Sequence, residues 1–301
     1  MSTPSPTDPR RLHYGEFYGL KPLPDADDRP FVIVVGNCQA ESLRILLDST
    51  SQIASVRTPA IHEWTEEDLT LARDLAARAD ALIMQPVRDG YRGLACGSAQ
   101  LSAYLPAHGQ LIGFPVLRFD GLMPYQAIIR SPSNPSLNPP LLPYHDLRVL
   151  ASAMGVTQAG EPSPENLRTL AAMSVDQLRR RERAHATVSV SDHLELHPVW
   201  HTINHPDNGT LCHLARQVCR ALGVEGSPAD PGRELLGGLE APVDKHAAAA
   251  LGVDVTGRDS WLPEPEGWVQ AHLDFYADNP DVVAAGVDRH GERMRLLGLG
   301  A

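Results

Sequence analysis

A cysteine flanked by two amide side chains follows the first strongly apolar run of the chain. The run Phe31–Val35 leads into Gly36-Asn37-Cys38-Gln39, and a helical pattern of apolar residues begins there. A thiol in the first turn of a helix meets N–H groups and positive potential, which lower its pKa and favour the nucleophilic thiolate. The same N–H groups, with the amides of Asn37 and Gln39, could hold the oxyanion formed when a carbonyl is attacked. The alternative is that Cys38 packs as a small apolar residue.

A second segment that could take part in catalysis lies far along the chain, where several histidines precede a predicted helix. A base that serves Cys38 must come from a distant segment that folds close to it. His205 is the first candidate and His201 the second. Asn204 or Asp207 could orient the imidazole, or Asp207 could simply cap the helix. The alternative is that these histidines are surface residues.

Cationic and aromatic residues follow the third and fourth predicted strands. Because the carboxyl ends of parallel strands meet at one edge of a sheet, these loops are expected at the same edge as Cys38. Arginines there could hold phosphate groups, and an aromatic ring could stack on a ligand. Surface ion pairs with nearby aspartates are the alternative. The candidates for cofactor binding are Arg88, Tyr91, Arg92, Arg118 and Phe119, and Gln85 is a further amide for the oxyanion.

Two other histidine patterns give weaker signals. Four histidines recur every four residues, as zinc ligands on one helix face do, but Pro198 and Pro206 interrupt any such helix; the four are His193, His197, His201 and His205. No metal is therefore predicted. His145 and Asp146 form an acid–histidine pair, but sequence neighbours seldom face each other, so a structural role is favoured and both stay secondary candidates.

The elements that must position these residues alternate between strands and helices. The predicted strands are residues 31–35, 53–57, 81–84 and 110–114, and the predicted helices begin near Ala40 and at Thr65, where a capping box precedes an apolar stripe. This alternation predicts an α/β fold with a parallel, Rossmann-like sheet flanked by helices, followed by a helical C-terminal part. Further helices are expected after Ser163-Pro164, at a second capping box at Ser174, over about 207–222, and as short pieces near 265–277.

The chain is expected to divide into three parts. Residues 1–30 hold six prolines and are expected to form an extended arm that adds little to the core. Residues 31–223 are expected to form the α/β catalytic domain. Residues 224–301 are rich in glycine and proline and are expected to be an extension packed on the same domain.

Composition excludes several classes of protein. The chain has 301 residues and a formal net charge of −11, which disfavours nucleic acid or an anionic membrane as the main partner. No apolar run reaches the roughly 18 residues of a membrane span, and the N-terminus lacks the apolar stretch of a secretory signal. Four cysteines do not make a disulfide framework, so a cytoplasmic location is expected. A serine nucleophile elbow and an ordinary phosphate-binding loop are both missing.

These residues resemble the WcbI family, polysaccharide-biosynthesis proteins regarded as acetyltransferases. The resemblance covers about residues 31–222 and is carried by Gly36-Asn37-Cys38-Gln39, Gln85 to Arg92, Phe119 to Pro124, Tyr144-His145-Asp146 and Asn204-His205-Pro206. It implies a sheet distantly similar to that of the SGNH hydrolases, binding of coenzyme A or acetyl-CoA, and O-acetylation of a sugar. It also implies that Cys38 takes the place of the SGNH nucleophile and His205 that of its base. Thr202 stands where the SGNH pattern has an aspartate, so a third triad member is not assigned.

Three hypotheses follow. The leading one is a CoA-dependent acyltransferase that acylates a hydroxyl of a sugar or natural product, with His205 activating either Cys38 or the acceptor. The second is a cysteine-dependent acyl hydrolase on an SGNH-like sheet, and the third is a non-catalytic protein that binds CoA or a nucleotide. All three expect a small-molecule or saccharide partner, and a homo-oligomer stays open.

Overall fold

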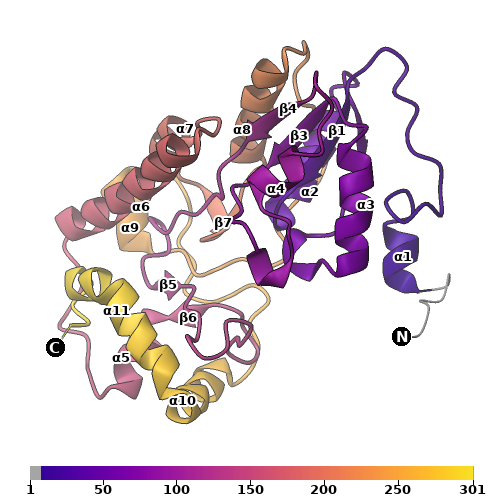
Figure 1. Cartoon of the computed structure of the whole chain (residues 1–301). Coiled ribbons are helices and arrows are strands. Elements are labelled where there is room, and N and C mark those ends of the chain that lie inside the picture. Colours follow the sequence, from indigo (N-terminus) through magenta and orange to yellow (C-terminus); the bar gives the residue numbers. More distant parts are fainter. Residues whose placement is uncertain (1–7, 301) are drawn as a thin grey trace. The chain divides into compact units, whose positions relative to one another are not determined.

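The computed structural model describes residues 8–300, and the chain divides into two units (Figure 1). The first unit contains the chain as far as Leu117, together with Leu178–His193 and Asn208–Leu236; the second contains Arg118–Gln177, Leu194–Asp207 and the chain from Gly237 onward. The three-part division at residues 30 and 223 that the sequence suggests stays a prediction.

The first unit is built on a parallel sheet of four strands in the order β2-β1-β3-β4. The strands are β1 (Phe31–Val35), β2 (Ala54–Val56), β3 (Ala81–Met84) and β4 (Gln110–Gly113). Every residue of β1, β2 and β3 is buried, as expected for a sheet covered on both faces. The predicted α/β fold with a parallel sheet is therefore confirmed.

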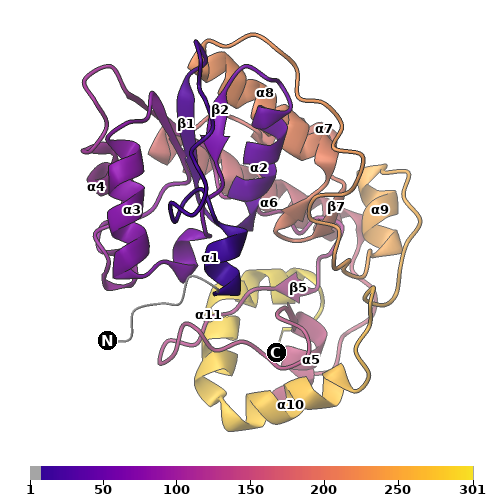
Figure 2. The same ribbon diagram turned by 90° about the vertical axis from the view of Figure 1, so that its right-hand side faces the viewer.

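Helices flank this sheet in the first unit. They are α2 (Cys38–Asp48), α3 (Glu66–Ala76), α4 (Ser98–Ser102) and α8 (Asn208–Leu222), with 3₁₀ turns at Ile61–Glu63 and Tyr91–Gly93. Helices α2 and α8 lie side by side (Figure 2). Ile33 and Val35 of β1 share a buried cluster with Leu69 and Leu75 of α3. The predicted capping box at Thr65 is present and begins α3.

The N-terminal segment is not simply extended. Residues 1–7 of the predicted arm lie outside the described residues, but Pro9–His13 form the short helix α1. Phe17 and Tyr18 are buried against the first unit's core. The Tyr18 hydroxyl donates to Asp68 at 2.5 Å, and Arg10 forms an ion pair with the same carboxylate at 3.1 Å. The prolines predicted an arm that contributes little to the hydrophobic core. Instead, the side chains of Phe17 and Tyr18 are part of the core of the first unit.

The second unit combines two small antiparallel pairs with helices. Strand β5 (Gln126–Ala127) pairs with β6 (His145–Asp146), and β7 (Trp200–Thr202) pairs with β8 (His205–Pro206). The helices are α5 (Leu147–Ala153), α9 (Lys245–Leu251), α10 (Trp268–Asp278) and α11 (Pro280–Leu296). The predicted helical C-terminal part is confirmed, although the sequence pattern predicts only the short piece near 265–277. The pattern misses α11 because its glycines favour loops, whereas Gly286 packs closely here: a Cβ would lie 2.8 Å from the end of the Leu150 side chain.

Two further helices contain residues of both units: α6 (Pro164–His185) and α7 (Ser191–Leu196). Helix α6 begins at Pro164 as predicted, and the Ser163 hydroxyl accepts from the N–H of Asn166. The second helix start predicted at Ser174 is wrong, because α6 continues through it and the Ser174 hydroxyl instead accepts from the N–H of Asp120. Within residues 8–300, no helix combines the length and apolarity needed to cross a bilayer.

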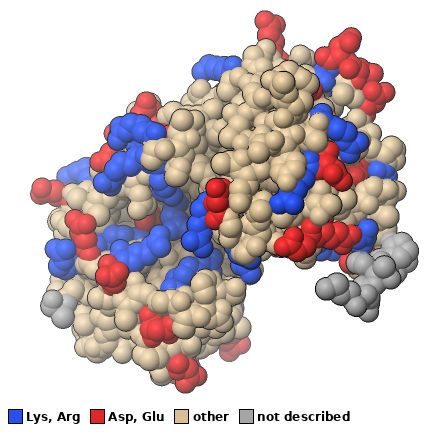
Figure 3. Space-filling model, viewed as in Figure 1, with Lys and Arg blue, Asp and Glu red and all other residues tan. Residues whose placement is uncertain are grey.

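Charge on the surface is uneven. Figure 3 shows Lys and Arg side chains gathered over α6, whose second half carries the sequence LRRRERAH. A net charge of −11 for the whole chain therefore coexists with a local basic surface.

Candidate functional site

The order of the strands changes direction at β1, because the chain goes from β1 to β2 on one side and then to β3 on the other. Strand β1 pairs with β2 on one side and β3 on the other, so the loops that follow β1 and β3 leave the sheet at a topological switch point. Ligands of open α/β sheets bind at such points, outside the carboxyl ends of the strands. Gly36 lies in the loop after β1, and a Cβ there would come within 2.5 Å of the Gln85 Oε1 atom. A glycine is therefore needed for the two loops to approach.

Two buried glutamines tie these loops together. The N–H of Asn37 donates to Gln85 Oε1 at 2.9 Å, and Gln85 Nε2 donates to Gln39 Oε1 at 3.0 Å. The Gln39 amide also clamps the backbone of Leu117, donating to its carbonyl at 2.8 Å and accepting from its N–H at 3.0 Å. Gln39 is 0% and Gln85 2% exposed. Both amides therefore position the loop from inside the protein, and their predicted role as oxyanion donors stays a prediction.

Cys38 is the first residue of α2 and is exposed. Asn37 caps the helix, because its side-chain oxygen accepts from the N–H of Gln39 at 2.9 Å. The expectation of a lowered thiol pKa is wrong. Desolvation by the surrounding walls raises the pKa of Cys38, and the N–H groups of Cys38 and Gln39 offset this only in part. Cys38 is therefore an exposed residue whose raised pKa favours the thiol over the thiolate.

Cys38 lines a cavity of about 520 Å³ in the first unit. Arg57 and Arg233 line the same cavity, and neither cation is among the residues predicted from the sequence. Arg57 forms an ion pair with Glu41 at 3.0 Å, and its guanidinium lies 5.5 Å from the ring of Tyr14. Arg57 directly follows the β2 segment, so its place at the same sheet edge could have been found from the sequence.

The loop that carries Arg233 is fixed to α8. The Asn208 side chain donates to the Arg233 carbonyl at 2.8 Å and accepts from the N–H of Leu235 at 3.1 Å. No sequence signal pointed to this loop, because it lies in an irregular stretch rich in glycine and proline.

The predicted cation loop after β3 lies at a different cavity. Arg88 lines a space of about 530 Å³ together with Met84, Gly113 and His185. Arg88 and Arg92 are exposed, and Tyr91 packs partly buried against the hydrophobic core. None of these three residues lines the cavity that contains Cys38. Their role in cofactor binding stays a prediction.

The histidine segment belongs to the second unit, where β7 and β8 form a tight antiparallel pair. The Tyr144 hydroxyl donates to Asn204 Oδ1 at 2.8 Å and lies 3.0 Å from the Thr202 hydroxyl. Tyr144 in turn stacks on Trp261, with ring centroids 5.3 Å apart. These contacts fix Asn204 immediately before His205.

His205 is only partly buried, and its environment favours the neutral ring. Burial lowers its pKa, and the nearby His201 lowers it further. The N–H of Phe119 donates to the Ile203 carbonyl at 2.8 Å, which joins the Arg118–Phe119 segment to this turn. Phe119 itself is buried and lies edge-on to Trp200, so its ring is a packing element here. Cys38 belongs to the first unit and His205 to the second, and their pairing stays a prediction.

The other predicted candidates have structural positions. His145 Nδ1 lies 2.7 Å from the Tyr276 hydroxyl, and both side chains are buried. Asp146 caps α5 by accepting from the N–H of Arg148 and also pairs with the Arg148 guanidinium at 2.7 Å. Asp207 directly precedes α8. The four regularly spaced histidines do not share a helix, and no group of His, Cys, Asp or Glu within residues 8–300 could hold a metal ion.

We expect acid to destabilise the protein through His145. Burial, with a smaller contribution from His272, lowers the pKa of His145 to about 4 from an ordinary value of about 6.5. Between these values the unfolded chain binds a proton that the folded protein does not, so stability rises with pH in this window and is lost as pH falls. The loss from His145 is about 3 kcal/mol between pH 7 and 4, on the scale of 1.36 kcal/mol per pKa unit.

Urea unfolding at pH 7, 5.5 and 4 measures this effect. His145→Gln is expected to flatten the pH dependence, whereas His246→Gln, at an exposed position, is expected to leave it unchanged. His290, whose pKa burial lowers to about 3, should preserve part of the slope in His145→Gln. Equal free energies of unfolding for the unmodified protein at pH 7 and pH 4 would contradict the prediction.

The sequence and the structure were compared with those of known proteins. No curated protein matches the sequence. A solved structure aligns with a TM-score of 0.66 over 87% of this chain and 99% of its own, at 19% sequence identity, which indicates a shared fold. That structure is described as WcbI, a polysaccharide biosynthesis enzyme, in a native form without a disulfide bond between coenzyme A and one of its cysteines. The model of the family described as polysaccharide biosynthesis enzyme WcbI matches residues 31–227. The chain therefore belongs to the WcbI family of polysaccharide biosynthesis enzymes.

Proposed function

We propose that the protein transfers an acyl group from an acyl-CoA to a hydroxyl of a saccharide, with the thioester end of the cofactor at Cys38. The observation that carries this proposal is the exposed thiol of Cys38 on the wall of a cavity at the switch point of the sheet. The structurally similar WcbI protein is described as a native form without a disulfide bond between coenzyme A and one of its cysteines. Such a bond requires the CoA sulfur to lie next to a cysteine. Cys38 is the candidate here, because Cys96 and Cys219 are buried and Cys212 is less exposed than Cys38 and does not line the cavity.

The same cavity offers partners for the phosphates of the cofactor. Arg57 and Arg233 line it beside Cys38, and guanidinium groups bind phosphate through paired hydrogen bonds. Arg88, Arg92 and Arg118 are further candidates for an extended cofactor. The adenine and pantetheine parts of CoA need more surface than one cavity provides, so both groups of arginines belong in the proposal.

The pKa directions favour direct transfer over a covalent intermediate. The raised pKa of Cys38 keeps the sulfur protonated, whereas the lowered pKa of His205 keeps its imidazole neutral and able to accept a proton. In the proposed step, His205 takes the proton of the acceptor hydroxyl as its oxygen attacks the thioester carbonyl. The new C–O bond forms, the C–S bond breaks, and CoA leaves as a thiolate that receives the proton from the imidazolium. The Asn37 amide and backbone N–H groups of the α2 N-terminus would stabilise the oxyanion.

A mass-spectrometric experiment tests the CoA site at Cys38. The protein is incubated with oxidised CoA (the CoA disulfide), and the intact mass is measured with and without reductant. We expect one reducible adduct of the mass of CoA. The adduct should be lost in Cys38→Ala and retained in Cys212→Ala, because Cys212 is only partly buried but lies on α8 away from the cavity lining. An adduct that persists in Cys38→Ala, or none in the unmodified protein, would contradict a CoA site at this thiol.

The hydrolase alternative uses the same cavity but sends the acyl group to water. Release of CoA from acetyl-CoA is therefore compared with and without a saccharide acceptor. Acyl transfer predicts release that depends on the acceptor, whereas the hydrolase predicts the same release in its absence.

A further inference from the structure

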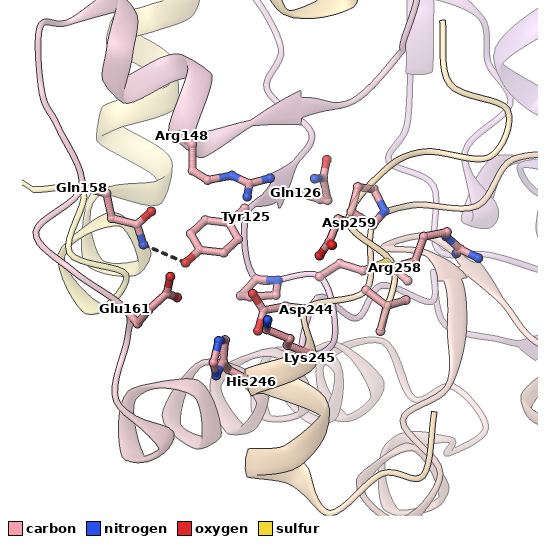
Figure 4. A pocket seen from close by; sticks show the side chains of 14 residues that line it. Tyr125, Gln126, Arg148, Gln158, Glu161, Asp244, Lys245, His246, Arg258 and Asp259 are labelled. Atoms are coloured by element: carbon pink, nitrogen blue, oxygen red, sulfur yellow. Dashed lines mark hydrogen bonds between the residues drawn. The ribbon is translucent and has the colours of Figure 1, made fainter. Parts of the chain in front are cut away.

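The second unit contains a polar cavity of about 260 Å³, remote in sequence from Cys38 (Figure 4). Its walls come from the β5 segment, α5, the loop before α6, and the start of α9. Tyr125 lies among the charged residues that surround it, and the Tyr125 hydroxyl accepts from Gln158 at 2.8 Å. Burial raises the pKa of Tyr125, and the carboxylates of Asp244 and Glu161, which line the same cavity, raise it further.

Two of the cations at this cavity are already neutralised by partners outside its lining. Arg148 makes two hydrogen bonds to Asp146, at 3.0 and 2.7 Å, and its guanidinium covers the ring of Tyr125 at 4.4 Å. Arg258 pairs with Glu240 and donates to the Ala241 carbonyl at 2.8 Å. Figure 4 shows the Arg258 guanidinium pointing away from Tyr125 and Asp244. Neither arginine therefore supplies a full uncompensated positive charge to a ligand.

Several polar groups at the cavity have no such partner. Within residues 8–300, the side chains of Glu161, Lys245 and Asp259 form no hydrogen bond or ion pair with the protein, and all three residues are exposed. Gln126 is 1% exposed, and its Oε1 atom is a buried acceptor without a partner. Asp244 uses Oδ1 to cap α9, which leaves Oδ2 to the cavity. The available groups are therefore mainly acceptors, and the donors are the Lys245 ammonium and the exposed ring of His246.

We propose that this cavity binds one ring of a neutral saccharide. Sugar hydroxyls donate to carboxylates and amide oxygens and accept from an ammonium group, and these are the groups left available here. An anionic ligand would face three carboxylates, Glu161, Asp244 and Asp259, against the single unpaired Lys245. A bound metal is disfavoured because no His, Cys, Asp or Glu group in residues 8–300 is arranged to hold one. A buried acceptor such as Gln126 Oε1 gains a partner when a hydroxyl enters.

The size of the cavity sets the scale of the ligand. Small-molecule sites are typically about 300–1,000 Å³, so a space of about 260 Å³ suits one ring rather than an extended chain. The ring can be part of a longer glycan whose other residues remain in solvent. Membership in a family of polysaccharide biosynthesis enzymes agrees with this ligand class. Saccharide binding at this cavity depends neither on CoA binding nor on acyl transfer.

Saturation-transfer NMR with the full chain tests the proposal. The probes are the methyl glycosides of glucose, galactose, mannose and N-acetylglucosamine at millimolar concentration. At least one glycoside is expected to receive saturation from the protein. Asp259→Asn and Glu161→Gln each remove a charged acceptor and are expected to weaken that binding about tenfold, as for loss of a hydrogen bond to a charged group. Asp254→Asn, an exposed carboxylate of the same unit outside the cavity lining, is the matched control.

The outcomes distinguish a saccharide site from an ion site and from an unoccupied hollow. The proposal is overturned when no glycoside receives saturation, or when Asp259→Asn and Glu161→Gln bind it as well as Asp254→Asn does. It is also overturned when inorganic phosphate or calcium chloride displaces the glycoside at equal concentration, because the cavity would then be an ion site. The CoA adduct at Cys38 is measured in the same variants. It should be unchanged, so failure of one proposal is distinguishable from failure of the other.

Discussion

Gln39→Leu is expected to lower the free energy of unfolding by on the order of 3–6 kcal/mol. The substitution leaves the N–H and carbonyl of Leu117 and the amide of Gln85 without their Gln39 partner. Each buried polar group deprived of its hydrogen bond costs about 1–3 kcal/mol. Gln39 is fully buried, so water cannot replace the lost contacts.

Urea unfolding followed by circular dichroism measures this loss. Gln270→Leu is the matched control, because Gln270 is exposed on α10 and makes one hydrogen bond to Asp274. The control should cost well under 1 kcal/mol. The rate of iodoacetamide labelling of Cys38 provides a second measurement in folded protein, since a loosened loop changes access to the thiol. A loss for Gln39→Leu no greater than that of the control would show that the glutamine network does not hold the loop.

His205→Ala is expected to reduce acceptor-dependent release of CoA by about 10²–10⁴-fold, the usual contribution of a general base. This expectation rests on the proposed transfer reaction. Because burial and His201 lower the pKa of His205, its imidazole stays neutral at pH 7. Activity should therefore persist to a pH below the ordinary histidine value of about 6.5 and fall as the ring becomes protonated.

Steady-state rates across pH 5–8 check both the magnitude and the direction. His108→Ala removes an exposed histidine of the first unit that lies 3.2 Å from Asp80, and it is expected to leave turnover unchanged. Cys38→Ala completes the set: retained turnover in this variant supports direct transfer, whereas complete loss supports an acyl-cysteine. Unimpaired turnover in His205→Ala would remove the imidazole from the mechanism.

Much of the first unit could be predicted from local patterns. The β-branched run 31–35 is a buried strand, and the apolar spacing after it places Ala40, Leu43 and Leu47 on the buried face of α2. These features depend on residue type and period alone, which is why they were predictable. Helix α11 was not, because the close packing of Gly286 against Leu150 is invisible from one segment.

The candidate site shows the same division. The position of Cys38 between a strand and a helix could be predicted from the sequence, but the direction of its pKa shift was predicted wrongly. A helix N-terminus is a local feature, whereas desolvation comes from walls contributed by other segments. Arg233 was missed because it reaches the cavity from an irregular loop after α8, whereas Arg57 directly follows β2 and could have been found from its place at the sheet edge.

The sequence by itself determined the alternation of strands and helices, the family, and the placement of a cysteine at a sheet edge. Only the tertiary structure decided which amide side chains are buried and hold the loops, and which cations share a cavity with Cys38. It also decided where acceptors without hydrogen-bond partners gather around Tyr125. The physical reason is range. Periodicity and capping act within a few residues, while Gln39 meets Leu117 across 78 positions, and burial depends on every segment that packs nearby.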